Sequence, residues 1–500
     1  LNFNFMSLTQ LKTGLFFLLF STFLKVGIAQ SLEEINGQVT TQQNEPLPYT
    51  TIFIISNQKG AISNEDGYFN LNTEGLLPSD SVRFQYVGYQ EQSFSIGQLK
   101  NNPIVKLTEK INQLGEVLVF GLPPNPETII KQVIKNLDKN YSKQPFQKNL
   151  FIRERNSQTI KNLEIDYKKS SINQVDENLF KEIEKKTPKY MTWYTDFLGD
   201  AYQLKTEDET KFKLTAERVV GLKQDELTET ENIEKIFGDL ARNTKEGEYW
   251  KIKTGIVSTK IDLDIEDTTK NKVAGNMQKM EYFVKNINGQ LGFATLKNED
   301  QWEFLHNPRK YNFTLVGGSR FNGENVYIID FEPKSGDFTG RVYISTDSYA
   351  LVRADYHYAP EKTGTDVHLL GIGYTKSGFD ASINFEKVEN KYYLKYFSKK
   401  ETTAYSVERK ISLIKKRERF LFDKELEEVK LALNLAMSDE SSIEIFIFNH
   451  QNITQEKFSS IKQEEYMKVI YVDQFDDQLW KGYSIIQPTE QMKSYKKVTE

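Results

Sequence analysis

Short stretches in which hydrophobic and polar residues alternate dominate the chain from about residue 35 onward. In the first hundred residues they read INGQVTT, TIFII, YFNL and SVRFQYVGY, and turn-forming segments such as NEDG at 64–67 separate them. A period of two places alternate side chains on opposite faces of a strand. Several short strands joined by such turns are typical of a β-sandwich, which we predict for residues 30–121.

The same alternation continues over a longer region, residues 145–420. In the segment LVRADYHYAP one face would carry apolar side chains and the other Arg353, Asp355 and His357. The segment SINFEKVENKYYLKYF is predicted to be a hairpin that turns near Glu389 and Asn390. An acidic helix is predicted at 233–240, but strands prevail, which favours a large antiparallel, curved sheet or half-barrel.

Helical periodicity appears in two places, a linker at 122–144 and a mixed α/β tail at 421–500. In the linker, Asn125 is a suitable N-cap and Pro126 a suitable first helical residue. In the tail, Thr454 is the predicted cap of a short helix that carries Phe458 and Ile461. A further tail helix is predicted after Asp423, because one helical face would collect Leu426, Val429, Leu433 and Met437.

The strings GAISNEDGYFNL and FQYVGY, with their spacing, resemble the carboxypeptidase regulatory-like domain, a transthyretin-type β-sandwich. This resemblance implies an exported protein of Bacteroidetes type, because the module often stands in front of TonB-dependent receptors. LGEVLVFG at 114–121 is similar to the link between that module and the receptor plug. The remaining chain is too short for a plug and a 22-stranded barrel, so only the module is carried over.

Two later segments carry weaker resemblances. The run from 311 to 356 resembles the lipoprotein-carrier half-barrels of the periplasm, and DQFDDQLWKGYSIIQPTE at 473–490 resembles a closing motif of the same exported family. The predicted fold class is therefore mainly β with some α. An N-terminal transthyretin-like β-sandwich is followed by a larger antiparallel β-rich domain and a short α-rich tail.

Residues 1–29 are predicted to be a signal peptide rather than part of the fold. Lys12 precedes an apolar core at 15–24, and the small residues Gly27 and Ala29 precede a cleavage point before Gln30. The alternative is an uncleaved N-terminal anchor. Because no later segment is long and apolar enough to span a bilayer, we expect an exported protein in the periplasm, at the outer membrane, or secreted.

Composition removes several classes of function. The net charge of −5 argues against a nucleic-acid partner, which requires a basic surface. The absence of cysteine excludes disulfides, thiolate metal sites and thiol nucleophiles. None of the four histidines is followed three residues later by a carboxylate, so no zinc carboxypeptidase site and no cofactor are predicted.

Other catalytic patterns are equally weak. The string GGSRF around Ser319 lacks the closing glycine of a nucleophile elbow, and a β-turn is predicted there. Asn64, Glu65 and Asp66 have oxygen ligands for calcium, but the full acidic series is missing and a hairpin turn is the preferred interpretation. No catalytic or metal residue is therefore assigned.

Aromatic clusters are the remaining candidates for ligand or partner contact. Trp480 and Tyr483 lie beside Asp476 and Asp477, which suggests a sugar-binding surface or a packed tryptophan that anchors the tail. Tyr393 and Tyr396 belong to an aromatic strand that either fills a core or lines a concave sheet.

Three functional hypotheses remain open. The first is a non-enzymatic cell-envelope binding or accessory protein whose partner is an unknown envelope protein, glycan or lipid. The second is a periplasmic lipid or lipoprotein carrier with an apolar cavity between sheet and helix. The third is a secreted hydrolase with a divergent site.

Overall fold

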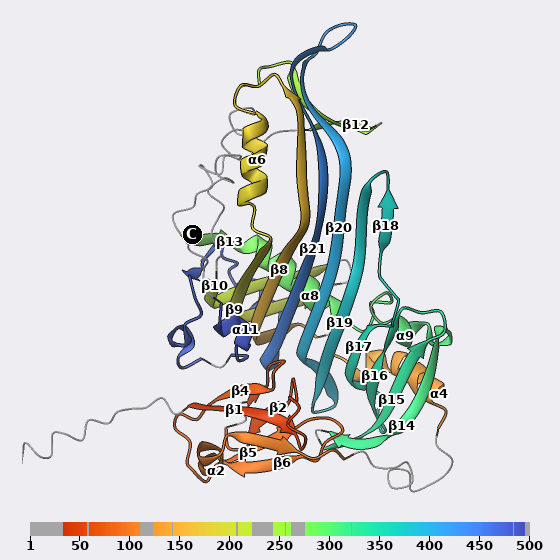
Figure 1. Cartoon of the computed structure of the whole chain (residues 1–500). Coiled ribbons are helices and arrows are strands. Elements are labelled where there is room, and N and C mark those ends of the chain that lie inside the picture. Colours follow the sequence, from red (N-terminus) through yellow and green to blue (C-terminus); the bar gives the residue numbers. More distant parts are fainter. Residues whose placement is uncertain are drawn as a thin grey trace, which may run out of the picture.

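The computed structural model describes residues 34–57, 60–110, 124–142, 144–206, 209–222, 244–255, 257–261, 276–321, 323–483 and 485–495. The predicted signal peptide, the segment 114–121 and the predicted helix 233–240 lie outside these residues. The described part confirms the predicted fold class, because it is mostly strand, with a small sandwich in front of a much larger antiparallel sheet (Figure 1).

The N-terminal unit consists of two small sheets packed face to face. One has the order β4-β1-β7 and the other β3-β2-β5-β6. Alternate residues of these strands point inward, so that Val39, Ile52 and Phe84 are fully buried between the sheets. The elements are β1 (Glu34–Thr41), β2 (Thr51–Ile54), β3 (Gly60–Ile62), β4 (Tyr68–Asn72), β5 (Ser81–Gln85), β6 (Gln92–Ser95), α2 (Ile96–Asn101) and β7 (Ile104–Leu107).

The predicted hairpin turn before β4 is present. The Asn64 carboxamide oxygen accepts hydrogen bonds from the backbone N–H groups of Asp66 and Tyr68, at 3.0 and 2.9 Å. Gly67 has φ of +76°, a left-handed conformation that favours glycine. The Asn64 side chain therefore supports the turn, as short polar side chains do in Asx turns.

The second unit is built on one sheet, which has fourteen strands among the described residues. Its main order is β14-β15-β16-β17-β19-β20-β21-β8-β9-β10-β23, and β11, β12 and β18 pair at its sides. The strands are β8 (Phe146–Ser170), β9 (Tyr190–Lys205), β10 (Thr210–Leu222), β11 (Glu248–Thr254), β12 (Val257–Ile261), β14 (Tyr311–Phe321), β15 (Glu324–Pro333), β16 (Phe338–Ser345), β17 (Leu351–Tyr358), β18 (Asp366–Leu369), β19 (Ile372–Val388), β20 (Lys391–Arg417), β21 (Lys424–Asn452) and β23 (Ile470–Val472).

Helices cover one face of this sheet. Their apolar side chains and those of the sheet form the main core. The predicted Asn125 cap and the buried Ile129 and Val133 are confirmed in the first helix. The elements are α4 (Pro126–Lys135), α5 (Leu137–Asn140), α8 (Met280–Phe293), α9 (Glu303–His306) and η1 (Pro308–Lys310), while α6 (Glu177–Lys186) packs on β8.

The tail covers part of the opposite face. It comprises α10 (Gln455–Ser460), β22 (Tyr466–Lys468), which pairs with β13 (Met277–Lys279), then η2 (Asp477–Trp480) and α11 (Glu490–Lys493). The predicted cap is confirmed, because the Thr454 hydroxyl accepts a hydrogen bond from the Lys457 N–H at 3.2 Å. The buried Phe458 then attaches α10 to strand β9.

The predicted helix after Asp423 is wrong. Its residues belong to β21, which pairs with β20 on one side and β8 on the other, so the sheet continues past the predicted boundary at residue 420. The apolar residues fit both periods, since Val429, Leu431 and Leu433 also alternate. Pairing with two neighbouring strands decides between the two periods. This pairing involves residues far away in the sequence, so the local periodicity does not reveal it.

Two turn predictions in the second unit have different outcomes. The hairpin near Glu389 is confirmed, because Val388 pairs with Lys391 and Glu389 has φ of +56°. The predicted turn around Ser319 is wrong, because these residues continue strand β14 after a register shift between Leu315 and Gly317. The two glycines thus follow a bulge within a strand.

The N-terminal unit docks on the sheet face opposite the helices. Tyr49 stacks on Tyr396 of β20 with ring centroids 4.7 Å apart. The Asn64 side-chain amide donates to the backbone oxygens at 487 and 488 of the tail, both at 3.2 Å. The Arg353 guanidinium donates to the Tyr86 hydroxyl oxygen at 3.2 Å. Strand β17 is therefore buried on both faces, and its polar face contacts the sandwich.

Candidate functional site

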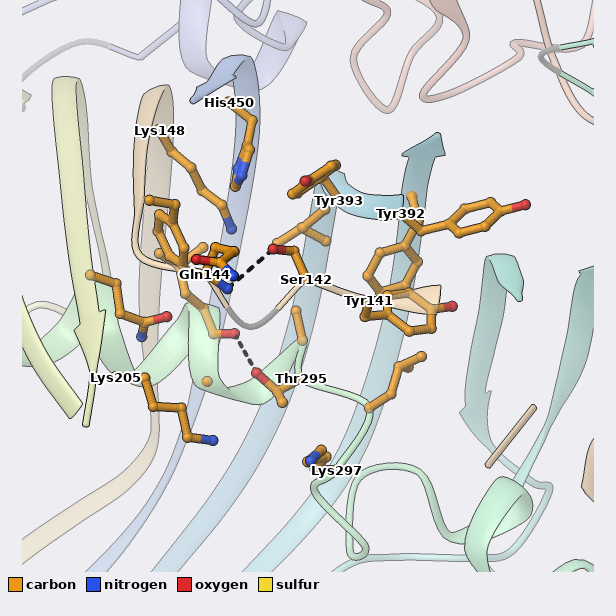
Figure 2. A pocket seen from close by; sticks show the side chains of 18 of the residues that line it. Tyr141, Ser142, Gln144, Lys148, Lys205, Thr295, Lys297, Tyr392, Tyr393 and His450 are labelled. Carbon is orange, nitrogen blue, oxygen red and sulfur yellow. Dashed lines mark hydrogen bonds between the residues drawn. The ribbon is translucent and has the colours of Figure 1, made fainter. Parts of the chain in front are cut away.

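A cavity of about 570 Å³ opens where one end of the large sheet meets the end of helix α8. Its walls come from the start of β8, the end of β21, the start of β20 and the segment after α8 (Figure 2). The volume lies in the range of small-molecule sites. The lining residues that matter for its chemistry are Tyr141, Ser142, Gln144, Phe146, Lys148, Lys205, Thr295, Lys297, Tyr393 and His450.

Lys148 supplies the buried charge of this cavity. Its residue is only 7% exposed, and within the described part of the chain no carboxylate forms an ion pair with it. Its ammonium nitrogen lies 4.2 Å from the centre of the Phe146 ring. Burial lowers the pKa of the Lys148 ammonium to about 8, so the group is still mostly charged at neutral pH.

His450 lies directly opposite Lys148 in the pairing of β21 with β8. A register shift between Ile447 and Asn449 inserts one extra residue into β21. The shift matters because Ile447 and His450 are three residues apart, which in a regular strand would put them on opposite faces. With the extra residue, His450 shares the face of Lys148, and Figure 2 shows both side chains reaching into the cavity.

The His450 ring is neutral at physiological pH. Burial and then the Lys148 charge lower its pKa to about 4. Both ring nitrogens are buried and form no well-directed hydrogen bond among the described residues, although the nearby Asn452 side chain partly offsets the lowering of the pKa. A neutral imidazole offers one N–H donor and one acceptor. It therefore presents a neutral donor and a neutral acceptor beside the lysine charge.

Aromatic rings and further cations complete the cavity. The Tyr393 and His450 ring centroids are 3.9 Å apart, and the Phe146 ring centroid lies 5.5 Å from that of His450. At the rim, the Lys297 ammonium forms an ion pair with Asp138 at 3.1 Å, and Lys205 is exposed. Lysine charge thus exceeds carboxylate charge around an apolar wall, a combination that suits an anionic group attached to an apolar or ring-shaped body.

The aromatic residues predicted for ligand contact fall in three different places. Tyr393 lines the cavity described above. Tyr396 is fully buried beneath Tyr49, and its hydroxyl donates to Glu444 at 3.1 Å. A bulge at Lys395, where the pairing with β19 moves from Leu394 directly to Tyr396, puts Tyr396 on the sheet face opposite Leu394 and against Tyr49. Tyr396 is thus part of the contact between the two units and cannot reach a ligand in this conformation.

Trp480 and Tyr483 do lie together, with ring centroids 6.2 Å apart. Trp480 is buried and packs edge-on against Phe151 of β8, at 5.5 Å. Tyr483 is half-buried and lies over the Arg218 guanidinium, at 4.6 Å. This packing matches the interpretation of a tryptophan that anchors the tail, although both residues also border a second, polar pocket next to β1 and β4.

The lipid-carrier hypothesis required an apolar cavity between sheet and helix, and this space is filled. Phe283 and Phe293 of α8 pack against Phe197 and Phe397 of the sheet, with ring centroids 6.3 and 5.4 Å apart. All four belong to the main core. A solid core here leaves no room for an acyl chain between the sheet and these aromatic residues of α8, and the cavity lies beyond them at the end of the helix.

The described residues offer neither a metal site nor a membrane-spanning helix. Among the described residues, no three His, Asp or Glu side chains lie close enough together to hold a metal ion. In the same part of the chain, every helix is too short or too polar to cross a bilayer.

Sequence reasoning missed Lys148, but the sequence contains a signal for it. Phe146, Lys148, Leu150 and Ile152 alternate along β8, and the last two belong to the main core. A lysine at an inward position of an otherwise apolar strand face is a buried-cation signal. His450 has no comparable signal, because its orientation depends on the bulge.

No curated protein matches the sequence. Among solved structures, the chain is similar at 8% identity to MucB in complex with MucA(peri), with a TM-score of 0.15 and coverage of 62% of this chain and 94% of that one. The Pseudomonas aeruginosa MucA/MucB complex gives a TM-score of 0.17 at 8% identity, with the same coverage of each chain. These TM-scores are too low to support an inference about fold or function.

The N-terminal unit gives a clear match. Residues 35–119 fit the family model described as CarboxypepD_reg-like domain. The match coincides with the two packed sheets β4-β1-β7 and β3-β2-β5-β6, and it agrees with the resemblance carried by GAISNEDGYFNL and FQYVGY. The first unit of this chain is therefore a carboxypeptidase regulatory-like domain.

Proposed function

We propose that this chain is a non-catalytic binding protein of the cell envelope whose cavity at Lys148 holds the anionic group of a small organic ligand. The observation that carries the proposal is a buried lysine with no carboxylate partner in the described part of the chain, directed into a cavity with aromatic walls. An isolated buried charge is costly, and a bound anion would offset that cost. The predicted signal peptide and the regulatory-like domain support the location in the envelope.

The geometry favours binding over catalysis. Within the described residues, the only carboxylate that lines the cavity is Asp138, which is paired with Lys297 at the rim. General-base catalysis by a histidine usually relies on a carboxylate that orients the ring, and among the described residues no carboxylate is bonded to His450. Lys148 with His450 instead provides a charge and two neutral hydrogen-bonding atoms for recognition.

The proposal is tested with benzoate and phenyl phosphate as anionic probes and benzamide as the neutral match for benzoate. Calorimetric titration and thermal melts of the mature chain are expected to show binding of the anions and little binding of benzamide. Stabilisation should follow the ratio of probe concentration to Kd. Binding should weaken as the pH rises through about 8, because Lys148 then loses its charge.

Two variants separate the buried cation from charge at the rim. Lys148→Met should abolish binding of the anionic probes, whereas Lys205→Met, which removes an exposed charge of the same cavity, should weaken it only slightly. Equal binding of benzoate and benzamide, or unchanged binding by Lys148→Met, would refute the anion site. Recovery of the native protein in the cytoplasmic fraction with residues 1–29 intact would refute the envelope location.

A further inference from the structure

The farthest point of the sheet from the N-terminal unit is an apolar tip. Strands β20 and β21 run side by side and are joined by a short turn at 418–423, at the top of Figure 1. Three consecutive large apolar side chains occupy this turn: Phe420, Leu421 and Phe422 are 101%, 78% and 86% exposed. Single exposed apolar residues are common, but three in succession on a projecting turn are a feature that needs an explanation.

The base of the tip is fixed to its surroundings. Arg417 forms an ion pair with Glu248 of β11 at 2.5 Å, and Lys260 of β12 pairs with Glu418 at 2.8 Å. The Tyr249 hydroxyl donates to the Asp423 carboxylate, also at 2.5 Å. These contacts hold both ends of the turn, so the apolar residues between them are presented outward rather than folded back on the sheet.

Cations surround the apolar residues. Residues 415–425 read KKRERFLFDKE and pair with Lys260, Glu248 and Glu427, so that six basic and five acidic side chains lie at the tip and its base. Arg419 and Lys424 are free of ion pairs within the described part of the chain. Charges act over about 10 Å at 0.1 M salt. This local excess of positive charge, rather than the net charge of −5, therefore determines what a surface touching the tip would experience.

The size and shape of the tip distinguish between two kinds of occupant. An aromatic side chain buries roughly 150–250 Å², so three large side chains bury roughly 500 Å². A specific protein–protein interface buries about 800 Å² on each partner, which a convex turn of this size does not supply. Insertion into the boundary between headgroups and acyl chains requires only a depth of about 5–10 Å and is strengthened by basic residues facing anionic lipids.

We propose that the turn at 418–423 is a membrane-contact site, in which Phe420, Leu421 and Phe422 insert into the surface of a bilayer and Arg419 and Lys424 bind anionic headgroups. The ligand is thus a lipid surface that carries phosphate groups, and the paired strands β20 and β21 behind the turn stay in water. This site is independent of the Lys148 cavity, which lies at the opposite ends of the same strands.

The first test is co-sedimentation of the full mature chain with vesicles of phosphatidylethanolamine and phosphatidylglycerol in a three-to-one ratio. The wild type should bind them, and binding should fall with added salt. The triple variant Phe420→Ser, Leu421→Ser, Phe422→Ser should bind at least about tenfold more weakly, because binding scales with the apolar area inserted. Arg419→Glu should lower the affinity for these vesicles and reduce the effect of salt.

A matched control lies on another exposed turn of the same sheet. Leu369 and Leu370 are 64% and 53% exposed at the turn between β18 and β19. That turn is next to Ile372, which pairs with Val407, about ten residues or roughly 30 Å along β20 from the tip. The variant Leu369→Ser, Leu370→Ser removes a comparable apolar pair and should leave vesicle binding unchanged.

Depth is measured with a single label. Because the chain has no cysteine, Leu421→Cys and Leu370→Cys each provide one site for a nitroxide. Vesicles should bury the label at 421 and leave the label at 370 in water. The proposal is overturned if the wild type ignores the vesicles, if the triple variant binds as well as the wild type, or if the label at 421 stays in water. It is equally overturned if the triple variant alters only self-association measured by analytical ultracentrifugation.

Discussion

Replacing Lys148 by methionine should make the protein more stable while removing its anion site. The pKa of the buried ammonium falls from 10.5 to about 8, and one pKa unit corresponds to about 1.4 kcal/mol. Keeping this group charged in the folded protein therefore costs about 3 kcal/mol at neutral pH. Methionine has a similar length and no charge, so the free energy of unfolding should rise by about 1–3 kcal/mol in Lys148→Met.

The sign of the pH dependence makes this prediction specific. The ammonium has a lower pKa in the folded than in the unfolded chain, so the folded state binds fewer protons between about pH 8 and pH 10.5. In that window the stability contributed by wild-type Lys148 increases with pH. The advantage of Lys148→Met should accordingly be full at pH 7 and shrink as the pH rises through this window.

Urea denaturation of both proteins, measured from pH 7 to about pH 10, gives this difference directly. Titration of the many tyrosines cancels, because both proteins contain them. Lys205→Met serves as the control for an exposed lysine of the same cavity and should change stability by less than about 0.5 kcal/mol. A Lys148→Met variant that is less stable at pH 7, or whose gain is the same at every pH, would refute the reasoning.

Three further predictions concern the contact between the two units and the tail. Burial raises the pKa of Glu444 to about 7, above its unfolded value of 4.5. The contribution of this group to stability should therefore decline between about pH 4.5 and 7. Glu444→Gln should flatten that decline in urea titrations. Trp480→Ala should lower the free energy of unfolding by about 3–5 kcal/mol, and Tyr483→Ala, at a half-buried position, by clearly less in the same assay. Asn64→Ala removes two hydrogen bonds to the tail and two that support the turn. It should lower the free energy of unfolding by about 2–3 kcal/mol and increase amide hydrogen exchange around 485–490. Unchanged exchange there would contradict the role given to this side chain.

The sandwich was predictable because its determinants are local. Alternation and the turn at Asn64 and Gly67 each act within a few residues, and the structure contains both. The caps at Asn125 and Thr454, which start helices outside the sandwich, are local in the same way. Strand β21 was not predictable in this way. Leu433 and Met437 satisfy a helical and a strand period alike, and only the two neighbouring strands decide between them.

The candidate site shows the same division. An inward lysine in β8 is visible in the alternation of Lys148 with the core residues Leu150 and Ile152. The position of His450 beside it results from one extra residue in β21, and the burial of Tyr396 results from a bulge in β20 and from the docked sandwich. Bulges and docking depend on hydrogen bonds and surfaces far apart in the sequence, so they cannot be predicted from the residues at the site.

Strand β21 begins at Lys424, next to the apolar tip, and carries His450 near its other end. At about 3.3 Å per residue, these two positions are separated by roughly 80 Å of strand, which is paired on both sides over residues 429–446. Such a strand works as a molecular ruler. If the tip is bound to a lipid surface, the strand holds the ligand in the cavity at a fixed distance from that surface, and the sandwich is the part farthest from the lipid.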